Sequence, residues 1–373
     1  MTAESSKAPR GATRAERVAA KQQAIVERAR RKEEKEKKAA RRADEQRVQQ
    51  DVAAIAYEHY LRVREWARTI AAASSGAPAH GHPADDETAR ALAHLWEATP
   101  ETIAQLRRWC EPISGVRSAD YEPPSAELTR RLQRESMALR SHRGMELFVQ
   151  ESPALGGFGA LRNGQRLNEE TLRWFAAAIA LEDGGVLGQF RGNARRQLVW
   201  EIGGGWGGFA YAFKTLCPNV TYVMTGTPET LLVSAVYLMT VFPGARCRFF
   251  EAAATNLWHE WQGVDFVFAP EWALPALPPP PLALTIDLMT LRRIETSRVC
   301  ALVEQAYDSG STYFYSLLPA AQAPEDARHV WDAIGRRYWL HPVPPRGMAG
   351  IASPPPAAPE GYVHVVGWRR IRA

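Results

Sequence analysis

The alternation of apolar and polar positions divides the chain into three stretches. Residues 1–50 show no regular apolar period, whereas apolar residues recur at steps of three and four from Val52 onward. The recurring positions predict a helix with one buried face: Ala56, Tyr60, Val63, Ala67 and Ile70. Helical patterns continue over about 87–110 and 125–140. Residues 51–150 are therefore predicted to form a helical cap region.

From about residue 190, short apolar runs alternate with amphipathic helical patterns. Six runs are predicted strands: Gln197–Ile202, Val220–Thr225, Arg246–Glu251, Val264–Phe268, Ala283–Ile286 and Thr312–Leu317. The helices between them are predicted to begin near Gly207, Pro228 and Arg298. This alternation is typical of a parallel, doubly wound sheet.

The C-terminal pattern differs from this alternation. Arg337–His341 and Tyr362–Trp368 are β-rich runs joined by a Pro-rich stretch without a helical pattern. They predict a terminal antiparallel hairpin. The expected fold class of 151–373 is thus α/β, a Rossmann-like doubly wound sheet of the methyltransferase kind that ends in an antiparallel hairpin.

Charge is concentrated at the N-terminus. Residues 1–50 hold 15 Lys or Arg and 8 Asp or Glu, and the rest of the chain holds 31 and 33. This stretch is predicted to be a charged, basic arm that is helical or disordered and suited to acidic surfaces. The remainder is close to neutral, so its site need not bind nucleic acid or another polyanion.

Other features exclude several classes of protein. The sequence has no run of 18 apolar residues, so it predicts no membrane span. The charged N-terminus does not have the pattern of a secretory signal. The four cysteines lie far apart and indicate neither a disulfide framework nor a metal site. We therefore expect a cytoplasmic location and predict no metal ligands.

The candidate chemistry centres on a glycine cluster after the first predicted strand, E-I-G-G-G-W-G-G at Glu201–Gly208. Glycines permit a sharp turn and the close approach of a ligand. The spacing of Gly203, Gly205 and Gly208 fits the dinucleotide fingerprint G-x-G-x-x-G. Glu201, Gly203, Gly205 and Gly207 also fit E-x-G-x-G-x-G, which resembles motif I of S-adenosylmethionine (SAM)-dependent methyltransferases.

Two flanking segments extend this resemblance. Glu151–Asn168 reads E-S-P-A-L-G-G-F-G-A-L-R-N-G-Q-R-L-N, and a P-E-T-L helix start follows the second predicted strand. Together with the glycine cluster, they resemble a sugar O-methyltransferase family over roughly residues 145–320. The resemblance implies a SAM-dependent methyltransferase core and a sugar or glycoconjugate acceptor.

The resemblance also implies the cofactor-binding residues. Gly203, Gly204, Gly205 and Gly207 would form the turn, Glu201 would face the methionine amino group, and Trp206 would cover the cofactor or border the acceptor site. Glu251 corresponds to an adenine-contacting acid. Gly226 stands where an Asp commonly binds the ribose, and Glu229 is the candidate replacement.

The acceptor side departs further from the family pattern. A sugar hydroxyl needs a base, and Asp287, after the fourth core strand, is the first candidate. His259 is the second candidate. Arg293 stands where the family pattern has an acid, and this departure concerns substrate handling more than cofactor binding. The sequence predicts no divalent metal site. A nicotinamide-dependent oxidoreductase and a non-catalytic methyltransferase-fold binding protein are the alternative functions.

Overall fold

The computed structural model describes residues 14–74, 83–251, 257–276, 278–319, 328–343 and 362–371. By its internal contacts the chain divides into Met1–Asp51 and Val52–Ala373. Helix α1 (Arg14–Ser74) contains the described residues of the first unit and begins the second. None of the helices in the described ranges carries an apolar stretch that could cross a bilayer.

The predicted apolar stripe of α1 packs as expected within the second unit. All five of its residues, from Ala56 to Ile70, are at most 3% exposed. Tyr60 accepts a hydrogen bond from the backbone N–H of Ala98 at 2.9 Å, and Trp66 donates one to the carbonyl of Phe250 at 2.6 Å. The C-terminal part of α1, from Ala56 to Ile70, therefore belongs to the main core.

A series of helices and 3₁₀ turns follows α1. The α-helices before the sheet are α2 (Pro83–Leu92), α3 (Pro100–Ala104), α4 (Glu111–Ser114), α5 (Ala126–Arg143), α6 (Glu169–Asp183) and α7 (Gly188–Arg191). The first 3₁₀ turns are η1 (Ala93–Glu97), η2 (Leu106–Cys110), η3 (Ser118–Asp120) and η4 (Ala154–Gly156). A small antiparallel pair, β1 (Ala160–Arg162) and β2 (Gln165–Leu167), precedes α6. Asn168 caps α6 reciprocally with Thr171, which fixes where this helix begins.

The second unit is organised around an eight-stranded sheet in the order β5-β6-β4-β3-β7-β8-β10-β9. The strands are β3 (Gln197–Ile202), β4 (Val220–Gly226), β5 (Cys247–Phe249), β6 (Phe266–Pro270), β7 (Leu284–Asp287), β8 (Tyr313–Pro319), β9 (Tyr338–Val343) and β10 (Tyr362–Arg369). Strands β3 to β8 pair in parallel, and β10 lies antiparallel between β8 and β9. The predicted fold class and terminal hairpin are confirmed.

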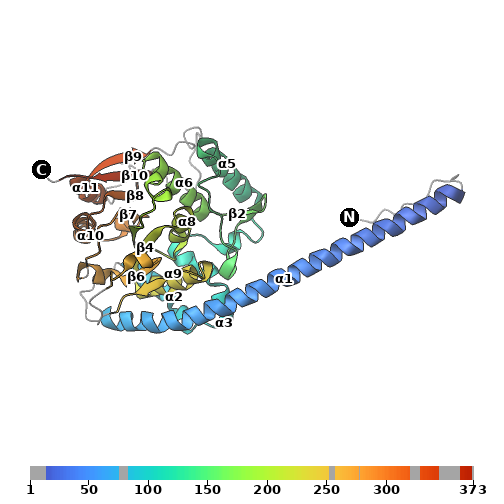
Figure 1. The fold of residues 1–373 in the computed structure, drawn as a ribbon, viewed down its shortest axis with the longest axis horizontal. Helices are drawn as coiled ribbons and strands as arrows, with labels where there is room; N and C mark the ends of the chain where they lie inside the picture. The colour runs from blue at the N-terminus through green and yellow to red at the C-terminus, as the bar shows by residue number, and fades with distance from the viewer. Residues whose placement is uncertain are drawn as a thin grey trace. The chain divides into compact units, whose positions relative to one another are not determined.

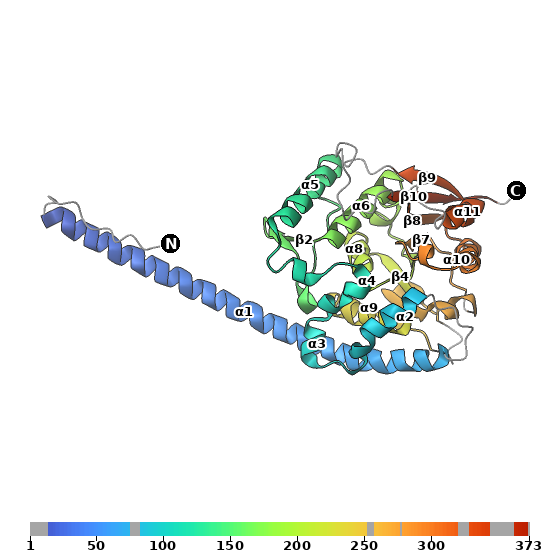
Figure 2. The same cartoon turned by 180° about the vertical axis from the view of Figure 1, so that it is seen from behind.

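Helices cover both faces of this sheet. The remaining α-helices are α8 (Gly208–Leu216), α9 (Pro228–Val241), α10 (Thr296–Asp308) and α11 (Arg328–Arg337), and the later 3₁₀ turns are η5 (Trp261–Gly263), η6 (Glu271–Ala276) and η7 (Leu291–Arg293). Figures 1 and 2 show α6 and α8 on one side of the strands and α10 and α11 on the other. The central strands are consequently buried on both faces, which explains their nearly continuous apolar sequence.

Candidate functional site

The glycine turn connects β3 to α8 through a backbone that most residues avoid. Gly203, Gly205 and Gly207 have φ angles of 65°, 55° and 90°. These values lie in the left-handed region, where glycine has no steric penalty. The N–H of Gly204 donates to the carbonyl of Thr225 at 2.9 Å, which ties the turn to the end of β4.

Close packing explains part of the glycine cluster. A Cβ atom on Gly203 would lie 2.5 Å from Cγ2 of Thr290, and one on Gly204 would overlap the side chain of Met224. At Gly205 the nearest side-chain atom would be Cγ2 of Ile113, at 3.3 Å. Gly203 is therefore favoured by both packing and backbone conformation, Gly204 leaves room for the end of the Met224 side chain, and Gly205 is favoured by its backbone conformation.

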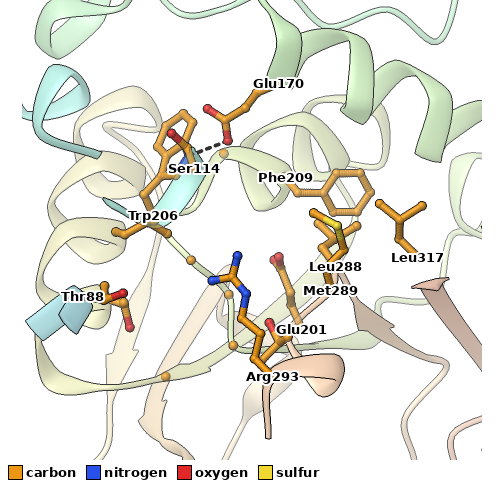
Figure 3. Close-up of a pocket in the computed structure, with 18 of the residues that line it drawn as sticks. Thr88, Ser114, Glu170, Glu201, Trp206, Phe209, Leu288, Met289, Arg293 and Leu317 are labelled. Atoms are coloured by element: carbon orange, nitrogen blue, oxygen red, sulfur yellow. Dashed lines mark hydrogen bonds between the residues drawn. The ribbon is translucent and has the colours of Figure 1, made fainter. Parts of the chain in front are cut away.

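A cavity of about 210 Å³ opens above this turn. Its wall includes residues that follow β3, β4 and β7, at the edge where ligands of open α/β sheets bind. Helices α2, α4, α6, α8 and α9, the turns η6 and η7, and strand β8 also contribute to the wall (Figure 3). Hydroxyl groups are frequent in the wall: Thr88, Ser114, Thr227, Thr230 and Thr290.

Glu201 contributes a buried carboxyl group to the cavity wall and is 4% exposed. The hydroxyl of Tyr222 donates to Oε2 at 2.8 Å, and no described residue donates to Oε1. Burial raises the pKa of Glu201 to about 7; the Tyr222 hydrogen bond opposes this rise, and the charge of Asp287 adds to it. A cation that enters beside Glu201 would favour the carboxylate, so this group is suited to bind a ligand ammonium.

Trp206 turns its indole into a buried network and is 3% exposed. Its Nε1 donates to Oε1 of Glu170 at 2.9 Å, as the dashed line in Figure 3 shows. Arg107 packs over the indole ring at 3.9 Å, pairs with Glu170, and donates from Nε to Glu151 at 2.8 Å. Trp206 contributes to the cavity wall, but its polar atom is engaged in holding the glycine turn against the helical region.

Asp287 lies at the end of β7 and is 0% exposed. Its carboxyl group accepts hydrogen bonds from the N–H groups of Thr290 and Leu291 at 2.8 and 3.0 Å, and from the Ser316 hydroxyl at 2.5 Å. Burial raises the pKa of Asp287 to about 6, although these hydrogen bonds lower it. Asp287 does not line the cavity, and its contacts hold the turn that leads into η7.

Three other predicted site residues lie outside the cavity wall. His259 is exposed, with 65% of its side chain accessible, and its nearest acid is Glu260 at 3.6 Å. Glu229 is half-buried on the first turn of α9, and Glu251 is exposed after β5. Their proposed roles in catalysis, ribose binding and adenine binding stay predictions.

Gly226 lines the cavity at the place where the family pattern has an acid. A Cβ atom here would lie 2.6 Å from Oγ1 of Thr230, so the helix start occupies the space that a side chain would need. Thr227 caps this helix through its hydroxyl. Hydroxyl groups therefore replace the expected carboxylate at this part of the wall.

The sequence did not reveal the contribution of the helices before the sheet. Thr88, Ser114, Glu170 and Arg173 all line the cavity, and Nη1 of Arg173 donates to the carbonyl of Ser114 at 3.1 Å. No local motif marks these residues. Arg293 also lines the cavity, and the signal for it was present in the sequence as a departure from the family pattern.

Known proteins give little further guidance. No protein-family model matches this chain, and no curated protein matches it either. Among solved structures, it is similar to the pyocyanin biosynthetic protein PhzM, with 14% identity, 53% of this chain and 57% of PhzM covered, and a TM-score of 0.34. The aligned part therefore spans less than two thirds of PhzM.

Two further solved structures show similarity of the same order. Magnesium protoporphyrin IX methyltransferase (ChlM) from Synechocystis PCC 6803, with bound SAM, is 11% identical, with 64% of this chain and 97% of ChlM covered and a TM-score of 0.35. WbdD is 14% identical, with 55% and 42% covered and a TM-score of 0.34. Because all three TM-scores are low, we base the functional conclusion on the residues of this chain.

Proposed function

We propose that this protein is a SAM-dependent O-methyltransferase that transfers a methyl group to a hydroxyl of a sugar or glycoconjugate. The observation that carries the proposal is the pairing of the glycine turn with the buried carboxyl group of Glu201 in one cavity wall. Oε1 of Glu201 has no donor among the described residues and belongs to a side chain that lines the cavity, so a ligand can supply that donor. The amino group of a bound amino-acid cofactor is a suitable partner.

The residues of the cavity fit this cofactor. Glu201 would hold the amino group, the backbone of Gly203–Gly205 would lie along the methionine part, and Arg173, which lines the same wall, would receive the carboxylate. Thr227, after β4, offers a hydroxyl for the ribose. SAM supplies a methyl group on a sulfonium, and the protein must position the acceptor oxygen, exclude water and accept a proton.

The acceptor class rests on the sequence resemblance together with the polar wall. Five hydroxyl side chains face a cavity whose apolar part includes Phe209 and Leu317. This mixture suits a polyol with apolar ring faces. The base stays a prediction: Asp287 would reach a substrate only if the turn that it holds opened, and His259 lies outside the wall.

Ligand binding tests this proposal directly. Thermal denaturation and calorimetry with SAM, S-adenosylhomocysteine (SAH) and NAD should show stabilisation by the first two compounds and none by NAD. Stabilisation by NAD alone would favour a nicotinamide-dependent oxidoreductase. A protein that binds neither SAM nor SAH would be a non-catalytic relative of the fold.

Methyl transfer itself would then be measured as SAH formation with a panel of mono- and oligosaccharides. The Glu201→Gln variant should lose cofactor binding, whereas the Glu260→Gln variant, at an exposed position outside the cavity wall, should retain it. Equal binding by both variants would show that Glu201 does not contact the cofactor.

A further inference from the structure

The acidic side chains of the cavity are largely engaged by basic residues outside its wall. Glu170 accepts from Trp206 and pairs with buried Arg107. Glu271 pairs with Arg298, whose Nε and Nη2 both lie 3.0 Å from Oε1. Glu271 therefore has a cation of its own, and Glu170 shares Arg107 with Glu151.

Arg293 is in the opposite situation. It ends η7 and is exposed, and Figure 3 shows its guanidinium projecting into the cavity. No ion pair or side-chain hydrogen bond joins it to another residue in the described ranges. The guanidinium carries five N–H donors in a planar fork, and all of them are available to a ligand.

The proposed cofactor makes this charge more significant. The methyl donor is cationic at sulfur, whereas Glu201 would be matched to its amino group and Arg173 to its carboxylate. The sulfonium and Arg293 would then both lack a negative partner in the same cavity. Like charges in a partly desolvated space repel more strongly than in water. A neutral acceptor would leave this repulsion unbalanced, and it would leave the N–H donors of Arg293 without an anionic partner.

We propose that Arg293 binds an anionic group of the acceptor, so that the substrate is a sugar carrying a phosphate or a carboxylate and not a neutral sugar. This inference rests on the proposed function. A guanidinium can donate two parallel hydrogen bonds to either oxyanion, which fixes orientation as well as affinity. Arg293 thereby selects the acceptor and places its hydroxyl relative to the methyl donor.

The test uses the full-length protein saturated with SAH and titrated with sodium phosphate or sodium acetate, against sodium chloride at matched ionic strength. Binding is followed by calorimetry. We expect at least one of the two anions to bind, and Arg293→Gln to weaken it tenfold or more. Arg293→Lys should retain part of the affinity, because it keeps the charge without the fork. Arg195→Gln removes an exposed arginine outside the cavity wall and should change nothing.

The outcomes separate the two proposals. SAH affinity should be the same in wild type and Arg293→Gln, which also shows that the variant is folded. A tenfold loss of SAH affinity in Arg293→Gln would assign Arg293 to the cofactor and overturn the inference. The inference also fails if neither anion binds the SAH complex, or if both bind wild type and Arg293→Gln equally. The proposed function fails separately, if wild type binds neither SAM nor SAH. Preference for phosphate or for acetate distinguishes sugar phosphates from uronates.

Discussion

The buried carboxyl group of Glu201 should make cofactor binding depend on pH. In the free protein its pKa is raised from 4.5 to about 7. A ligand ammonium beside it would return the pKa toward its ordinary value, so binding releases a proton below pH 7. A pKa difference of this size corresponds to roughly 3 kcal/mol at 1.36 kcal/mol per unit.

This shift sets the size of the effect. Between pH 8 and pH 5.5 the Kd for SAH should rise about thirtyfold, because the protein must first lose the proton from Glu201. Calorimetry at pH 6 in buffers of different ionisation enthalpy should detect release of about one proton. In Glu201→Gln, the Kd at pH 8 should rise about 10- to 100-fold through loss of a charge-assisted hydrogen bond, and its pH dependence should disappear.

The same substitution should stabilise the protein without ligand. A raised pKa means that the folded state favours the protonated acid, so the stability due to this group is complete below pH 4.5 and is lost as the pH rises through about 7. Glu201→Gln should therefore unfold at a higher temperature than wild type at pH 8, with a smaller difference at pH 5. A Kd that is constant from pH 5.5 to 8 in wild type, or an unchanged pH dependence in Glu201→Gln, would refute this reasoning.

Three further variants test the surroundings of the site. Gly205→Ala should cost about 1–2 kcal/mol, because alanine is strained at a φ of 55°, and thermal denaturation should show no such loss for Gly244→Ala, where a Cβ meets nothing within 4 Å. Ser316→Ala removes a hydrogen bond to Asp287 and should lower the free energy of unfolding by about 1.5–3 kcal/mol at pH 8. The loss should be smaller at pH 5, where Asp287 is protonated, and equal losses at the two pH values would contradict the assigned contact. Arg107→Met should cost about 3–5 kcal/mol in chemical denaturation because it leaves two buried glutamates without their cation, and neutralising both glutamates in the same variant should recover much of that loss.

The sheet could be predicted from the sequence because its signals are local. The largely apolar segment Gln197–Ile202 and the glycine cluster after it define β3 and the start of α8 within a residue. Edge strands are less well determined, and β5 covers only Cys247–Phe249 of the predicted Arg246–Glu251. An edge strand has one pairing partner, so its length depends on that neighbour more than on its own pattern.

The cavity wall could be predicted only in part because many of its residues meet through long-range contacts. Arg107 lies 44 residues before Glu151 and 63 before Glu170, and no spacing rule joins these positions. Sequence reasoning expected Trp206 to cover the cofactor or border the acceptor site, and that role stays a prediction. The structure shows its Nε1 bonded to Glu170, a partner that the glycine motif does not reveal.

The buried network around Trp206 also explains how the glycine turn keeps its shape. Glycine gives the turn its shape, but a turn of small residues has few side-chain contacts to hold that shape. Trp206 supplies such a contact, since Glu170 and Arg107 fix its indole from two directions. Residues of the predicted helical cap region (51–150) and residues after it therefore both determine the geometry of the turn. The helical residues that precede the sheet act as part of the site, because they hold the backbone against which a cofactor would lie.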